Sequence, residues 1–68
     1  MTYIVIELQT NAAGQTANIV TAYDNQPQAE NKFHSILAAA AVSAVPKHAA
    51  VILNEDGLIV KQWCYDHS

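Results

Sequence analysis

The chain has 68 residues, of which 51% are hydrophobic and 13% are charged, and its net charge at pH 7 is −3. This length corresponds to one domain, residues 1–68, whose core is so small that it needs a further source of stability. With three lysines and no arginine, the chain has no basic surface for nucleic acid or for an anionic membrane.

Residues 2–10 have the composition of a β-strand, because β-branched and aromatic side chains fill the first half of the segment. Farther along, polar and apolar side chains alternate, with Glu7 and Gln9 on one side. This alternation predicts that the other side, which carries Ile4, Ile6 and Leu8, faces the core.

A turn and a second strand are expected next. Residues 11–14 begin with asparagine and end with glycine, a composition that suits a hairpin loop. Residues 16–23 then form the second strand, and the sequence leaves its inward side open between two sets. These sets are Ile19, Thr21 and Tyr23 on one side, and Val20 and Ala22 on the other.

A long helix is expected to begin after Asp24 and to end at about residue 43 or 44. Asn25 or Gln26 can cap its first turn, where Pro27 is tolerated. Pro46 ends the helix because the residue before a proline is disfavoured in the α conformation. Six residues along one half of the helix are expected to face the sheet: Ala29, Phe33, Ile36, Leu37, Ala40 and Ala44.

Residues 47–54 and 58–65 are expected to form a second hairpin, joined by the tight turn Glu55-Asp56-Gly57. The first and third strands are the most apolar on both sides, as central strands should be. The sequence therefore predicts an α+β fold of the order ββαββ. A four-stranded antiparallel sheet, in the order 2-1-3-4, carries one long alanine-rich helix on one face.

The outer side of the helix is the first candidate interface. A helix on the surface of a lone small domain normally has a charged outer face, but this one carries small, uncharged side chains at the spacing of a helix–helix seam. We therefore expect a homo-oligomer. The candidate seam consists of Asn31, Ser35, Ala38, Ala39 and Val42. Alanine is also a strong helix former, so a merely solvated helix face is the other interpretation.

A face of the sheet is the alternative interface, and its residues would be Tyr3, Val5, Ile59 and Trp63. An aromatic patch without nearby arginine or lysine suits a protein contact better than the stacking of nucleic-acid bases. The two candidate interfaces do not exclude one another.

No motif in the chain points to catalysis, a cofactor or a metal, and we assign no residue to any of these roles. Cys64 and His67 have a Cys-x-x-His spacing, but a strand places them on opposite faces, whereas zinc needs three or four converging ligands. We expect a half-buried thiol and a solvated tail histidine. His34 and Ser35 are neighbours on a helix and diverge, so they cannot pair as base and nucleophile.

The chain is expected to be cytoplasmic. Its N-terminal segment lacks the basic region of a signal peptide. The longest apolar stretch, residues 36–45, falls short of the ~20 residues that a transmembrane helix needs. A single cysteine forms no intramolecular disulfide and is compatible with a reducing compartment.

Three stretches are similar to a known group of proteins: KFHSILAAAAVS at residues 32–43, KHAAVIL at residues 47–53 and YIVIELQT at residues 3–10. They resemble short hypothetical proteins encoded in bacterial genomes and in phage or prophage clusters, and the resemblance covers nearly the whole chain. It implies a phage or prophage setting, with a virion-associated location as one form of it. It implies no activity and no catalytic residue.

Three functions are therefore considered. The first is a non-enzymatic, self-associating protein that serves as a phage or prophage accessory or structural component. The second is a small inhibitor or adaptor that binds one host protein through its aromatic fourth strand. The third is a small oligomeric enzyme with a site between subunits near His34 or His48, which would need a cleft that brings a histidine to a carboxylate.

Overall fold

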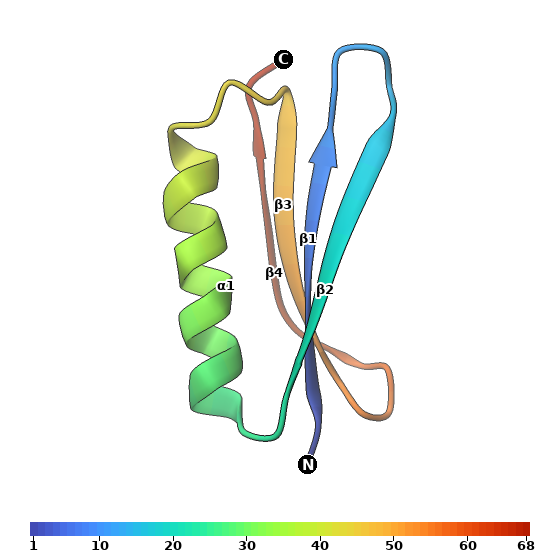
Figure 1. Cartoon of the computed structure of the whole chain (residues 1–68), viewed down its shortest axis with the longest axis vertical. Coiled ribbons are helices and arrows are strands. Elements are labelled where there is room, and N and C mark those ends of the chain that lie inside the picture. Colours follow the sequence, from blue (N-terminus) through green and yellow to red (C-terminus); the bar gives the residue numbers. More distant parts are fainter.

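The computed structural model describes residues 1–68 and has two layers, a sheet and one helix (Figure 1). In chain order the elements are β1 (Tyr3–Thr10), β2 (Thr16–Tyr23), α1 (Gln26–Ala41), β3 (Lys47–Asn54) and β4 (Ile59–Asp66). All neighbouring strands are antiparallel, in the order β2-β1-β3-β4. The predicted ββαββ fold and strand order are confirmed.

The two hairpin turns are built in the same way. The side-chain oxygens of Asn11 and Asn54 each accept hydrogen bonds from the backbone N–H groups two and four residues later. Gly14 and Gly57 then adopt φ angles of 82° and 80°, a left-handed conformation that glycine reaches without steric cost. The predicted turn positions are correct, and both turns run from an asparagine to a glycine three residues on.

The helix begins as predicted and ends earlier. Asn25 caps it, because its side-chain oxygen accepts a hydrogen bond from the Gln28 N–H at 2.9 Å, and Pro27 lies in the first turn. The last helical residue is Ala41, and Val42 forms the C-cap. No helix of the chain has both the length and the apolar character that crossing a membrane requires.

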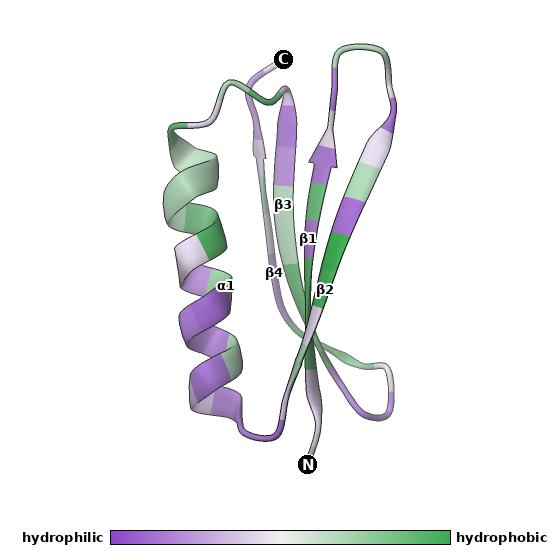
Figure 2. Cartoon of the chain, in the orientation of Figure 1, coloured by the Kyte–Doolittle hydropathy of each residue, from purple (hydrophilic) through white to green (hydrophobic).

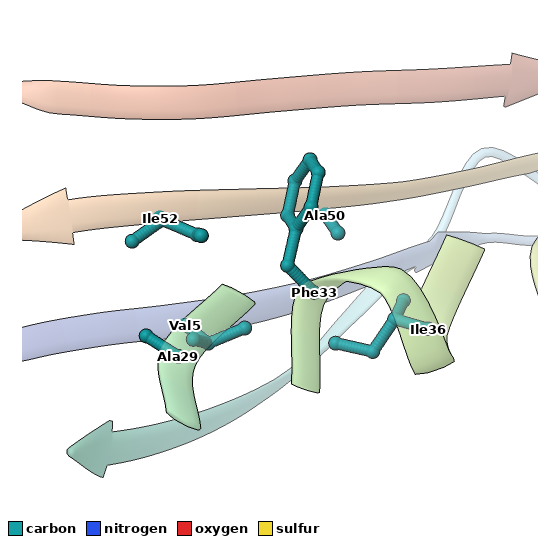
Figure 3. Packing of buried hydrophobic residues seen from close by; sticks show 6 residues of the cluster. All are labelled: Val5, Ala29, Phe33, Ile36, Ala50 and Ile52. Carbon is teal, nitrogen blue, oxygen red and sulfur yellow. The ribbon is translucent and has the colours of Figure 1, made fainter. Parts of the chain in front are cut away.

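The core lies between α1 and the two central strands. Its buried side chains are Val5, Ala29, Phe33, Ile36, Ala50 and Ile52 (Figure 3). Of the residues predicted to face inward from the helix, Leu37 packs at the edge of this cluster, whereas Ala44 is exposed beyond the end of the helix. Ala40 is also buried.

The predicted inward side of β1 is wrong. Val5 is 1% exposed and faces α1, so Ile4, Ile6 and Leu8 point to the opposite side of the sheet. The prediction failed at Glu7. The alternation pattern predicted that Glu7 points to solvent, but its side chain lies beneath the helix and is hydrogen-bonded to His48. Because side chains alternate along a strand, one residue on the unexpected side means that every residue of β1 lies on the face opposite to the predicted one.

Candidate interaction surface

The face of the sheet opposite α1 carries apolar side chains from all four strands. Since Val5, Ala50 and Ile52 point toward the helix, their strand neighbours and the residues paired with those neighbours point away. We call this surface the open sheet face. Its apolar side chains are Ile4, Ile6, Leu8, Val20, Ala22, Ala49, Val51, Leu53, Ile59 and Cys64.

Exposure and charge set the open sheet face apart from an ordinary protein surface. Val20 and Ile59 are 57% and 63% exposed, and the aliphatic side chains of β1 and β3 between them are half-buried. Figure 2 shows the hydrophobic residues in the middle of β1, β2 and β3. The charged residues of this face, Lys47 and Asp66, lie opposite each other on β3 and β4 at one end of the sheet. Contiguous apolar surfaces of this kind usually mark an interaction site.

The open sheet face is large enough for a specific contact. Four strands about 4.8 Å apart, each of eight residues at ~3.3 Å, cover about 500 Å² in plan. Two such faces together reach the ~1,000 Å² that separates specific interfaces from incidental ones. Two packed sheets lie about 10 Å apart, with their side chains interdigitated.

The residues predicted to form the outer side of the helix are exposed in the structure. Asn31, Ser35, Ala38 and Ala39 are exposed on α1, and Val42, 87% exposed, lies at the C-cap just beyond the last helical residue. Most of these side chains are alanine or serine, so each has little apolar area to bury in a contact.

The alternative sheet-face interface is wrongly composed. Tyr3 and Val5 lie on the helix side, and Val5 belongs to the core. Trp63 pairs with buried Ala50 and therefore also lies on the helix side, at the edge strand. Only Ile59, which pairs with Leu53, belongs to the open sheet face. The error follows directly from the exchanged faces of β1.

A buried pair of Glu7 and His48 lies on the helix side of the sheet. His48, 4% exposed, donates from Nε2 to Glu7 Oε2 at 2.6 Å, and Gln9 Nε2 donates to the same oxygen at 3.0 Å. Burial raises the pKa of Glu7, but the hydrogen bonds from His48 and Gln9 and the charges of His48 and Lys32 lower it more. The net result is a Glu7 pKa below its ordinary value.

The pair of Glu7 and His48 lies away from the surface hollows of the molecule. His48 Nδ1 is buried and has no hydrogen-bond partner, so no third group orients the ring or receives a proton from it. The surface hollows lie at the ends of the sheet, along the β1–β2 turn and at the start of α1, and neither Glu7 nor His48 lines them. His34 is exposed on the helix, and its ring packs in a T-shaped arrangement with the Phe33 ring.

The remaining candidate ligands are separated. Cys64 is exposed on the open sheet face, whereas the His67 ring hydrogen-bonds to the Ala40 carbonyl at 2.9 Å and stacks on Tyr65. His67 is thus anchored to the end of α1, a contact that the expected solvated tail did not include. No group of three or more histidine, cysteine, aspartate or glutamate side chains is arranged to hold a metal ion.

Comparisons with protein families, with curated proteins and with solved structures found no match to this chain. The functional argument therefore rests on the residues and geometry described above.

Proposed function

We propose that this chain is a non-enzymatic protein that acts by self-association, and that the open sheet face of one copy packs on the open sheet face of another. The observation that carries the proposal is the continuous aliphatic surface of that face, with Ile6 and Val51 at its centre. Burial of such a surface is favourable by about 25 cal/mol per Å² before the costs of association are subtracted.

A second copy fits this face better than an unrelated partner does. A twofold axis brings identical patches together, and the central part of the patch has no charge to be desolvated or repelled. The molecule is small and has 8 buried residues out of 68, so a second sheet layer would supply the stability that its own core lacks. The phage or prophage setting implied by the resemblance suits an accessory or structural component that assembles in this way.

Val51→Lys is expected to abolish the face-to-face contact. Val51 lies on a central strand between Ile6 and Gln62, and a lysine there remains solvated in the monomer but is buried without a partner in the pair. Light scattering across a dilution series should give half the wild-type mass or less. A wild-type chain that is monomeric at every concentration would contradict the proposal and favour the adaptor function.

Val42→Lys and Ala38→Glu are the matched controls on the helix outer face. Val42→Lys is the same chemical change at an 87% exposed position, and Ala38→Glu introduces a charge into the predicted helix seam. Both variants are expected to keep the wild-type mass. If either of them splits the assembly while Val51→Lys does not, the helix seam is the interface.

A further inference from the structure

The outer edge of β2 is a second surface that lacks a partner within the chain. β2 is an edge strand of eight residues, and the first five of them are exposed. Its sequence, TANIVTAY, contains no charged residue and no proline. Natural edge strands are normally protected against pairing by charges, proline or bulges, and β2 has none of these.

The opposite edge of the same sheet is protected. β4 carries Lys61, which forms an ion pair with Glu30 of the helix, and it ends at Asp66. A register irregularity between Ile52 and Leu53 also disrupts the β3–β4 pairing. The contrast within one sheet singles out β2 as the edge that is open to another strand.

The free backbone groups of β2 can be assigned from the hairpin. The Asn11 N–H donates to the Gln15 carbonyl at 2.9 Å, and bonded pairs in an antiparallel ladder recur at every second residue. The backbone groups that point away from β1 are therefore those of Thr16, Asn18, Val20 and Ala22.

We propose that β2 pairs in antiparallel fashion with β2 of a second copy, which makes one continuous sheet. The register that joins all four outward-pointing residues pairs Thr16 with the partner's Ala22, and Asn18 with the partner's Val20. Ile19 then lies beside its own symmetry mate. This accounts for Ile19, which is 56% exposed on the helix side, where α1 does not cover it.

The edge contact uses a different surface from the face-to-face contact. It rests on the proposed function in one respect, that both contacts join copies of this chain. A twofold axis perpendicular to the sheet leaves both helices on one side and both open sheet faces on the other. Two edge-paired dimers can then pack face to face, so the wild-type assembly is a tetramer.

Asn18→Pro tests the edge. The Asn18 N–H points outward, so proline removes a donor that the monomer does not use, and proline is tolerated on edge strands. The control is Asn18→Thr, which keeps the N–H. Light scattering should give half the wild-type mass for Asn18→Pro and the full mass for Asn18→Thr, with far-UV circular dichroism unchanged in both.

Ile19→Lys is the second variant, in case proline unfolds the hairpin. It keeps every backbone donor and places two lysines beside each other across the axis, so it should also halve the mass. Unchanged mass in both Asn18→Pro and Ile19→Lys would overturn the edge contact.

The four combinations of variants separate this inference from the proposed function. Val51→Lys alone should leave the edge-paired dimer, Asn18→Pro alone the face-to-face dimer, and the double variant a monomer. If Val51→Lys alone already gives a monomer and Asn18→Pro has no effect, the edge contact is wrong and the face contact stands. The reverse result rejects the face contact and keeps the edge contact.

Discussion

Phe33→Ala is expected to remove a large part of the folding free energy of the chain. Phe33 is 4% exposed and packs between the helix and the Ala50 region of β3 (Figure 3). Truncation of a buried phenylalanine costs about 4 kcal/mol. At roughly 0.05–0.15 kcal/mol per residue, a domain of 68 residues has only about 3–10 kcal/mol in total.

The measurement is urea unfolding followed by far-UV circular dichroism, with Phe33→Leu as the control. Leucine keeps most of the apolar volume and should cost about 1 kcal/mol. Each variant is measured at a low and a high protein concentration, because association of folded copies adds stability by mass action. An unfolding midpoint of Phe33→Ala equal to that of the wild type would mean that the core is not where the structure places it.

Local signals were sufficient to predict the topology. The asparagine and glycine residues of the two turns, the Asn25 cap and Pro46 each act within a few residues, so they mark where elements begin and end. The apolar character of both sides of the first and third strands then distinguishes central from edge positions. Together these signals determine the strand order 2-1-3-4 without any knowledge of long-range contacts.

The inward face of the sheet could not be predicted in the same way, because a contact between residues 41 positions apart decides it. The alternation pattern predicts a solvated Glu7 side chain, but the hydrogen bond to His48 holds it on the helix side of the sheet, where it is 15% exposed. The size of the side chains is the signal that could have revealed this. Ala29 on the helix and Ala50 on the sheet allow the two layers to approach closely, whereas the bulkier Ile6 and Val51 lie on the other face.

The misplaced face also explains the outcome for the interface residues. Self-association was inferred from the small core and from the uncharged outer side of the helix, and neither depends on which face of the sheet points inward. The choice of residues for the sheet interface did depend on the inward face of the sheet. The structure therefore places Tyr3, Val5 and Trp63 on the helix side instead. The same exchange brings Ile4, Ile6 and Leu8 to the open sheet face.

Glu7→Ala is the second change with a large expected effect. It leaves His48 buried without a partner at Nε2, and Nδ1 already has none. Loss of one member of a buried, hydrogen-bonded pair costs about 3 kcal/mol. Glu7→Gln keeps an oxygen that can accept from His48, so it should retain most of the wild-type stability at neutral pH. Urea unfolding of the two variants near pH 7 compares these outcomes.

The same carboxylate makes the stability depend on pH in a defined direction. Because the folded-state pKa of Glu7 lies below its ordinary value, the folded chain holds fewer protons than the unfolded chain between the two values. The stabilisation is complete above the ordinary carboxyl pKa and is lost as the pH falls through the folded-state pKa. The unfolding free energy should therefore decrease as the pH falls below about 5.5.

Two exposed carboxylates contribute to the same acid loss, and variants separate them from Glu7. Hydrogen bonds from Lys61 and from Ser68 hold the pKa values of Glu30 and Asp66 below the ordinary range, but solvent weakens surface interactions of this kind. Glu7→Gln should reduce the loss of unfolding free energy at low pH more than Glu30→Gln does, because Glu7 faces a buried histidine. If Glu30→Gln and Glu7→Gln reduce this loss equally, the buried pair has no special role in stability, and His48 must find its stabilisation elsewhere in the fold.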